Sequence, residues 1–243
     1  MPGTMLFTMI IAFALSISVA VAIGIASLVG AWQADLNFLA VVKEMFGALN
    51  KFPLAAIPFF ILAGNLMESG GISARLVEFA KSIVGGIQGG LAATCVLTCM
   101  IFAAVSGSSV ATTFAIGAIL IPALIKHGYP TSYAAALQAT SAELGVIIPP
   151  SIPMILYGVS AEVSIGELFI AGVGPGLLIG GALMIFVIVY ARWKGYGKGD
   201  HEGRLPFFAA TRKALFALLM PVIILGGIYG GIFTPTEASV VAV

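Results

Sequence analysis

The stretch from Ala104 to Ser151 decides the fold of this chain. It begins with Ala104-Val105-Ser106-Gly107-Ser108-Ser109-Val110-Ala111-Thr112-Thr113 and ends with Ile147-Ile148-Pro149-Pro150-Ser151. Both segments are polar or helix-breaking interruptions in sequence that is otherwise apolar enough to lie in a bilayer. In hydrocarbon, an unpaired backbone N–H or C=O costs several kcal/mol, so a broken backbone persists there only around a protein-lined site or a water-filled cavity. Two such breaks close together therefore predict a binding site inside the membrane, of the kind that transporters use.

The composition places the whole chain in a membrane. Hydrophobic residues make up 60% of the sequence, charged residues make up 9%, and the mean hydropathy is +1.13. A soluble domain carries about 25% charged residues, so this chain lacks a water-facing surface. At roughly 20 residues per span, the length predicts an all-α polytopic membrane protein with about six membrane segments. The net charge of +1 and the lack of a long basic run argue against a nucleic-acid partner.

Several segments flank the central stretch. Met5 to Val29 is a continuous apolar run that predicts one spanning helix. Residues 31–52 and 72–84 alternate apolar and charged residues at helical spacing, which predicts two surface-lying amphipathic helices. The two cysteines, Cys95 and Cys99, lie four residues apart with no His, Asp or Glu nearby, so we expect them to pack as small apolar residues.

Two apolar arms, Gly89 to Val105 and Val110 to Ile125, flank the segment Ser106-Gly107-Ser108-Ser109. If both arms crossed the membrane, they would be two spans joined by a tight turn. If they met inside the membrane, they would form a re-entrant hairpin. Each arm is at or below the lower length limit for a full span, and the turn contains no charge, Asn or Asp. We therefore favour the re-entrant hairpin, near residues 89–125.

The segment 131–159 predicts a helix broken into two halves. Neither Pro149 nor Pro150 has an N–H, and each proline disfavours helix in the residue before it. A span over 169–191 and a basic hydrophilic loop over 192–213 follow, and the positive-inside rule places this loop in the cytoplasm. The base of the hairpin would then face the cytoplasm as well. A last apolar segment begins at residue 214, and Thr234-Pro235-Thr236-Glu237 predicts the start of a further helix, which suggests a truncated chain.

The hydroxyl groups near the two breaks are the candidate binding groups. Hydroxyl oxygens of Ser106, Ser108 and Ser109, together with freed carbonyls, are hard ligands suited to Na⁺, and Thr112 extends the same polar face. The helix N-termini beside them would offer positive dipole ends to a carboxylate substrate. A packing interface of small residues would explain the Ser/Gly cluster, but it would not explain the second cluster.

Glu143 is the other candidate, because an intramembrane carboxylate is costly. It is either functional or a helix-stabilising residue paired with a basic or hydroxyl group on a neighbouring helix. The second cluster, Pro149, Pro150 and Ser151, lies shortly after it.

Other functions receive less support from the sequence. An intramembrane protease would need a base to activate a serine hydroxyl, and His127 and His201 lie at the predicted hairpin base and in the predicted loop. Broken helices also line ion channels, but no segment resembles a selectivity-filter repeat. A channel or a membrane scaffold subunit therefore stays as the alternative to a carrier, and an enzyme is not expected.

Four segments of the chain, in this order, resemble the large membrane subunit (DctM-like permease) of the tripartite ATP-independent periplasmic (TRAP) transporters. They are Phe60-Ile61-Leu62-Ala63-Gly64-Asn65-Leu66-Met67, Ser106-Gly107-Ser108-Ser109-Val110-Ala111-Thr112, Ile147-Ile148-Pro149-Pro150-Ser151-Ile152-Pro153 and Phe233-Thr234-Pro235-Thr236-Glu237-Ala238. The resemblance implies a sodium-driven elevator-type carrier in the bacterial or archaeal cell (inner) membrane, built from two inverted repeats. It implies as partners a small membrane subunit, a periplasmic substrate-binding protein and an organic acid such as a dicarboxylate or sialic acid. It implies Na⁺ as the coupling ion and no other cofactor.

Carried over to this chain, the resemblance makes residues 1–213 the first repeat and residues 214–243 the start of a second, truncated one. It places Ser106 to Ser109 at the tip of the first hairpin, and it places Pro149, Pro150 and Ser151 at the break of the following helix. Together these residues resemble the first sodium site and one wall of the substrate site.

Overall fold

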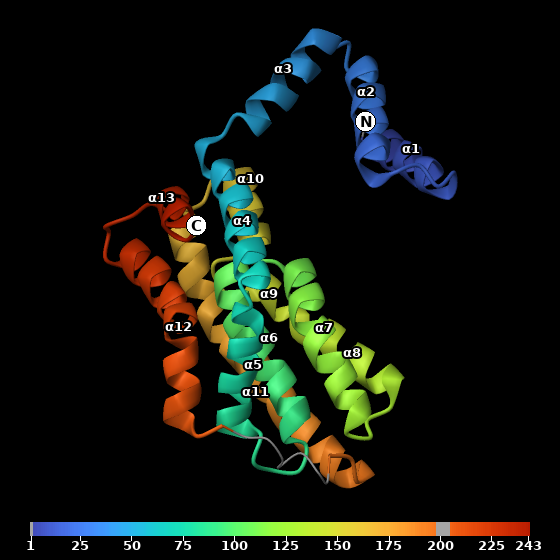
Figure 1. Cartoon of the computed structure of the whole chain (residues 1–243). Helices are drawn as coiled ribbons and strands as arrows, with labels where there is room; N and C mark the ends of the chain where they lie inside the picture. Colours follow the sequence, from blue (N-terminus) through green and yellow to red (C-terminus); the bar gives the residue numbers. More distant parts are fainter. Residues whose placement is uncertain (1, 198–204) are drawn as a thin grey trace. The chain divides into compact units, whose positions relative to one another are not determined.

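The computed structural model describes residues 2–197 and 205–243. The chain divides into two compact units, Met1–Phe52 and Pro53–Val243, which are described separately below. In the described residues, all regular secondary structure is helical (Figure 1). This confirms the predicted all-α class.

The first unit contains three helices, α1 (Pro2–Ala14), α2 (Val19–Gln33) and α3 (Phe38–Leu49). The expected single span over residues 5–29 is wrong, because the chain reverses at Ser16, whose φ is +59°. Ser16 and Ser18 lie at this break between α1 and α2, where serine side chains can compete with helical backbone bonds. The hydroxyl of Thr4 in α1 donates to Oε1 of Gln33 in α2 at 2.5 Å, so α1 and α2 pack as a hairpin.

Helix α3 stands where an amphipathic helix was expected over residues 31–52, and it is shorter than that range. It begins after Asn37, whose side chain accepts a hydrogen bond from the backbone N–H of Leu39 at 2.9 Å. Such a cap satisfies one of the free N–H groups of a helix start. None of its twelve residues is buried within the unit, and its position at a membrane surface stays a prediction.

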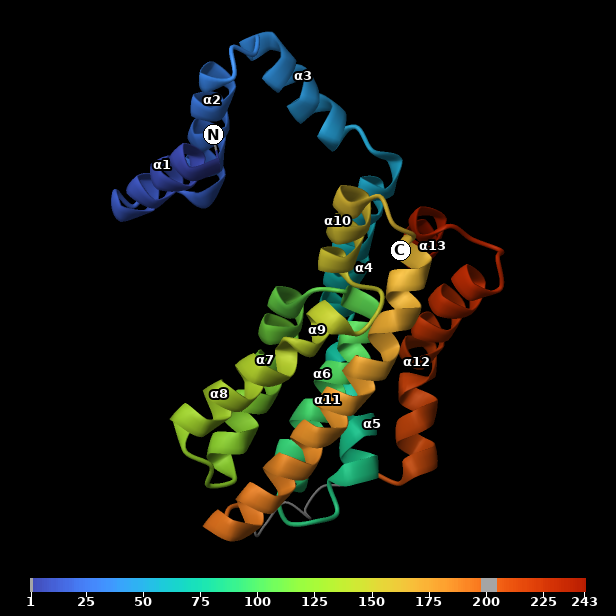
Figure 2. The same ribbon diagram turned by 180° about the vertical axis from the view of Figure 1, so that it is seen from behind.

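The second unit is a bundle that carries both predicted breaks (Figures 1 and 2). Its helical elements are η1 (Phe52–Ala55, which begins at the boundary), α4 (Ala56–Ser69), α5 (Ile72–Val84), α6 (Gly90–Ser106), α7 (Ser109–Lys126), α8 (Thr131–Ala142), α9 (Leu144–Ile147), α10 (Ile152–Ala161), α11 (Ile165–Lys194), α12 (Phe207–Tyr229) and α13 (Pro235–Val241).

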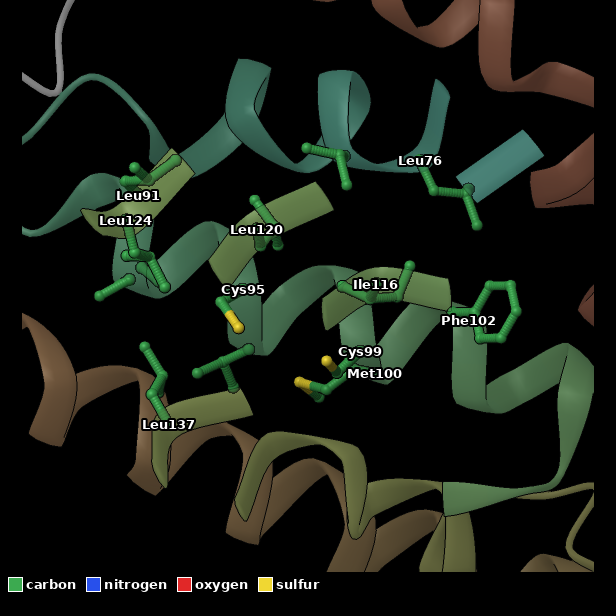
Figure 3. Close-up of a cluster of buried hydrophobic side chains, with 14 of the residues drawn as sticks. Leu76, Leu91, Cys95, Cys99, Met100, Phe102, Ile116, Leu120, Leu124 and Leu137 are labelled. Carbon is green, nitrogen blue, oxygen red and sulfur yellow. The ribbon is translucent and has the colours of Figure 1, made fainter. Parts of the chain in front are cut away.

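Helix α6 forms the centre of this bundle. Fourteen of its seventeen residues are buried, and it packs against α5, α7, α8 and α11. Figure 3 shows its Cys95, Cys99 and Phe102 side chains among those of the neighbouring helices. Both cysteines are free and fully buried, which confirms their predicted packing role.

Four helical segments of the described residues are long and apolar enough to cross a membrane, and the bent pair of segments 131–147 and 152–161 makes a fifth candidate. The four are Phe52–Ser69, Ser109–Lys126, Ile165–Lys194 and Phe207–Tyr229. The span expected over 169–191 is therefore longer at both ends. The chain is a multi-pass membrane protein.

Helix α5 has the predicted bounds but not the predicted place. It packs along α6 and α12, and its Leu76 and Ala80 side chains are fully buried. The expectation of a surface-lying helix is wrong because the apolar stripe of α5 faces protein inside the bundle. An amphipathic stripe fits either a membrane surface or a helix neighbour, so the pattern alone does not distinguish them.

The predicted loop over 192–213 is shorter than expected. Helix α11 continues to Lys194 and α12 begins at Phe207, whereas Lys198 and Arg204 lie outside the described residues. The predicted helix start near Thr234 is confirmed, because Thr234 and Glu237 form a capping box at the beginning of α13.

Candidate functional site

The turn between α6 and α7 forms the tip of the predicted hairpin. Gly107 ends α6 with a φ of +61°, a conformation that glycine adopts without steric cost. Ser108 follows with extended backbone, and its hydroxyl oxygen accepts a hydrogen bond of 3.3 Å from the N–H of Ala111. A glycine C-cap followed at once by a serine N-cap therefore reverses the chain in two residues.

The tip is enclosed by protein rather than exposed. The Ser106 side chain is 1% exposed, and Gly107 is buried. A Cβ added at Gly64 of α4 would lie 3.3 Å from Cβ of Ser106, so α4 also packs closely against the tip. A turn buried in protein is consistent with the re-entrant hairpin, which stays a prediction.

The broken helix lies directly against this tip. The backbone N–H of Ile152 donates to the carbonyl oxygen of Gly107 at 3.1 Å. A Cβ at Gly107 would lie 2.7 Å from the carbonyl oxygen of Pro150, and a Cβ at Gly145 would lie 3.0 Å from the carbonyl carbon of Ser108. Two breaks separated by about forty residues in sequence thus meet at one place.

The break itself spans residues 148–151, between α9 and α10. The Pro149–Pro150 peptide bond is cis, and the segments on either side are bent by 40°. Ser151 is fully buried. Its hydroxyl donates to the carbonyl oxygen of Val146 at 2.5 Å and accepts from the N–H of Met154 at 3.5 Å. This one side chain therefore caps both sides of the break.

Hydroxyl groups gather on the α7 side of the tip. The Ser106 and Thr112 hydroxyl oxygens lie 3.3 Å apart, and both side chains are buried. The Thr112 hydroxyl also donates to the carbonyl oxygen of Ser108 at 2.8 Å. Ser108 and Ser109 are partly buried. The structure thus brings together Ser106, Ser108 and Thr112, and the Gly107 contacts join them to the Pro150–Ser151 break.

A cavity of about 600 Å³ lies beside the tip. It is lined by Ser108, Val110, Ala111 and Phe114 from the hairpin and by Ile61, Asn65 and Glu68 from α4. Two polar side chains of α4 therefore share a cavity with the N-cap serine of α7.

Glu143 occupies a different position from the buried hydroxyls. It is exposed, in the single-residue junction between α8 and α9. Its carboxylate has neither a hydrogen-bond partner nor an ion-pair partner among residues 2–197 and 205–243. The alternative of a helix-stabilising pair therefore finds no partner in the described part of the chain.

Gln138 is a buried polar residue that the sequence reasoning missed. Its Nε2 donates to the carbonyl oxygen of Thr112 at 3.2 Å, and its Oε1 accepts from Sγ of Cys95 at 3.1 Å. It is 1% exposed. A lone glutamine in an apolar helix such as 131–142 is the signal that could have identified it, since buried amides are retained only with partners.

Comparisons with known proteins agree with the resemblance. Residues 4–243 match the family described as the tripartite ATP-independent periplasmic transporter, DctM component. The C4-dicarboxylate TRAP transporter large permease protein DctM of Pseudomonas aeruginosa is 48% identical over 199 residues, which cover 82% of this chain and 47% of that protein.

Two further relatives are named for other substrates. The isethionate TRAP transporter permease protein DctMQ of Oleidesulfovibrio alaskensis is 46% identical over 90% of this chain and 34% of its own length. The sialic acid TRAP transporter large permease protein SiaM of Vibrio cholerae is 39% identical over 90% of this chain and 51% of its own length. This chain therefore spans about half the length of the DctM and SiaM relatives. All three names describe permeases, not enzymes.

Proposed function

The chain belongs to the DctM component family of the tripartite ATP-independent periplasmic transporters, and on this basis we propose that it supplies one half of a Na⁺-coupled carrier for an organic acid. The half consists of the hairpin α6–α7 and the broken helix α8–α10, as the first of two inverted repeats. The relatives, about twice as long, would contain the second half.

The observation that carries this proposal is the contact between the two breaks. The hydrogen bond from Ile152 to the Gly107 carbonyl holds the hairpin tip against the interrupted helix. Backbone breaks are expensive in a membrane unless they line a site, and here two of them are in contact. The hydroxyl and carbonyl oxygens of Ser106, Ser108 and Ser109 are the candidate ligands for Na⁺.

The proposed substrate is a small organic acid. The C4-dicarboxylate, isethionate and sialic acid named for the relatives all carry an acidic group. The N-termini of α7 at Ser109 and of α10 at Ile152 begin beside the contact, and helix N-termini favour anions. The cavity beside Ser108 has a volume in the range of small-molecule sites.

The proposed partners are a small membrane subunit and a periplasmic substrate-binding protein, and the proposed location is the cell membrane of an archaeon or the inner membrane of a bacterium. The family description names a tripartite periplasmic system, which is consistent with two further components. This part of the proposal concerns the whole transporter.

The experiment is uptake into proteoliposomes. A full-length large subunit that carries this sequence would be reconstituted with its small subunit and supplied with its binding protein. We expect uptake of a radiolabelled organic acid that saturates and requires both an inward Na⁺ gradient and the binding protein. Equal uptake with a K⁺ gradient in place of the Na⁺ gradient would contradict the proposed coupling to Na⁺. Unitary conductance steps in a planar bilayer would instead indicate a channel.

A further inference from the structure

A basic groove lies between α5 and α12. It has a volume of about 520 Å³ and is lined by Gly71, Ala74, Arg75, Glu78, Arg212, Lys213 and Phe216. Three of these residues are cations and one is an anion. The only ion pair within this lining joins Nζ of Lys213 to Oε2 of Glu78 at 3.2 Å. The guanidinium groups of Arg75 and Arg212 pair with no carboxylate in the described ranges 2–197 and 205–243.

The walls of the groove are held in place by packing on both helices. Leu76 and Ala80 of α5, and Ala214 and Ala217 of α12, are buried, and the rings of Phe79 and Phe207 lie 6.0 Å apart. The Lys213–Glu78 ion pair joins the same two helices. A ligand would therefore have to order only long basic side chains, not the backbone.

Beside these charges, α12 presents an apolar surface. Phe216 is 79% exposed and shares the groove with the basic residues. Leu219, Val222 and Ile223 continue this exposed surface along the helix, which is long and apolar enough to span a membrane. A ligand that fits both features has a compact anionic head and an apolar tail.

We propose that this groove binds the phosphate of an anionic phospholipid, whose acyl chains lie along Phe216 and the following turns of α12. Arg75 and Arg212 would hold the phosphate oxygens, because planar guanidinium groups form paired hydrogen bonds with phosphate. Lys213 is paired with Glu78, so the excess positive charge of the groove comes from Arg75 and Arg212. The positive-inside rule predicts that these residues face the cytoplasm, where the leaflet is rich in anionic lipid.

The test is native mass spectrometry of the purified protein with phosphatidylglycerol, and with phosphatidylcholine as the zwitterionic comparison. The double variant Arg75→Gln/Arg212→Gln should bind phosphatidylglycerol about tenfold more weakly, with little change for phosphatidylcholine. The matched control is Lys126→Gln/Arg192→Gln, which removes two exposed cations outside the groove. An equal loss in this control would indicate attraction by net charge only, and it would overturn the site.

A second variant tests the groove even if the double variant folds poorly. Glu78→Gln removes the only anion of the groove and frees Lys213, so it should bind phosphatidylglycerol more tightly than the unmodified protein. A merely structural role for the ion pair predicts weaker binding instead. Inorganic phosphate alone at millimolar concentration should not compete with the lipid. Full competition would assign the groove to a soluble anion and overturn the lipid.

Discussion

The side-chain amide of Gln138 donates a hydrogen bond of 3.2 Å to the backbone oxygen of Thr112. This bond joins the first half of the broken helix to the hairpin arm that carries the tip hydroxyls. On its other side, Gln138 accepts from Cys95, so one amide connects α6, α7 and α8. We infer that Gln138 positions Thr112, whose hydroxyl lies 3.3 Å from that of Ser106.

The first prediction concerns this amide. Gln138→Leu keeps the side-chain size but removes the hydrogen bonds to Thr112, Cys95 and Cys99, so Thr112 loses one fixed neighbour. A hydrogen bond inside the bilayer is worth on the order of 1 kcal/mol, and we expect a several-fold rise in the Na⁺ concentration that gives half-maximal transport. The measurement is the initial uptake rate against Na⁺ concentration in proteoliposomes containing equal amounts of variant and unmodified protein.

Gln88 offers a matched control at the other end of the hairpin. Its Nε2 donates to the carbonyl oxygen of Tyr196 at 3.1 Å, so Gln88→Leu also removes one side-chain amide bond. We expect this control to lower thermal stability to a similar degree without changing the Na⁺ dependence. If both variants shift the Na⁺ dependence equally, Gln138 has only a structural role.

The two breaks could be predicted from the sequence because they go against local helix chemistry. Gly107 needs a positive φ, and Pro149 and Pro150 cannot continue a helix. Charged and apolar residues at helical spacing likewise gave the bounds of α5 correctly. What such patterns do not contain is the identity of the packing partner, which is why α5 was expected at a surface and lies in the bundle.

The features that the sequence did not predict depend mostly on contacts between residues that are far apart in the chain. The partners of Gln138 are 26, 39 and 43 residues away, and no local pattern indicates them. The reversal at Ser16 was hidden because serine is tolerated in apolar spans. The exposure of Glu143 also depends on which residues surround it, and the sequence gives only its neighbours.

The second prediction concerns the close approach at the tip. Gly107→Ala forces alanine into a positive φ and also brings its Cβ to 2.7 Å from the Pro150 carbonyl oxygen. The positive φ alone costs about 1–2 kcal/mol, and the collision should add to it because the Pro150 oxygen is a backbone atom that cannot rotate away. We expect a lower melting temperature of the detergent-solubilised protein and loss of uptake in the reconstituted transporter.

Gly128 separates the two effects. Its φ is +85°, and a Cβ there would meet no atom within 4 Å. Gly128→Ala should therefore show the cost of the positive φ without the collision. The contact between the breaks predicts that Gly107→Ala is clearly the more damaging of the two. Equal melting temperatures and equal uptake would contradict it.

The third prediction is the membrane orientation. The hairpin base and the end of α11 lie at one end of the bundle, since the rings of Tyr129 and Tyr196 are 5.7 Å apart. Cysteines introduced at the exposed positions Lys126 and Arg192 should thus be labelled from the same side, and the positive-inside rule makes this side cytoplasmic. A cysteine at exposed Ala161, at the end of α10, should be labelled from the opposite side.

The measurement uses a membrane-impermeant thiol reagent on intact and on permeabilised cells. Cys95 and Cys99 are fully buried and should stay unlabelled, which provides the background. Labelling of Arg192→Cys in intact cells would show that the orientation is the opposite of the predicted one. Labelling of Lys126→Cys and Arg192→Cys from different sides would contradict the re-entrant hairpin itself.

The fourth prediction concerns the hydroxyls at the tip. Ser106→Ala and Ser108→Ala each remove an oxygen ligand but keep a small side chain, whereas a Gly107 change alters the backbone. If these oxygens bind Na⁺, each variant should need roughly tenfold more Na⁺ for half-maximal uptake, since a lost contact inside the bilayer is worth on the order of 1–2 kcal/mol. Raising the Na⁺ concentration should then restore most of the rate at unchanged protein abundance.

Ser27 is the matched control for these variants, because its hydroxyl only donates back to the carbonyl oxygen of Ile23 in its own helix. Ser27→Ala should leave the Na⁺ dependence unchanged. A tip that merely packs small residues predicts the reverse for Ser106→Ala and Ser108→Ala, with lower membrane abundance and no rescue by Na⁺.

Glu143→Gln belongs in the same series of uptake measurements. Because the Glu143 carboxylate is exposed, we expect this variant to reach the same membrane abundance as the unmodified protein. A changed Na⁺ dependence of uptake would then add Glu143 to the site. An unchanged Na⁺ dependence would remove it.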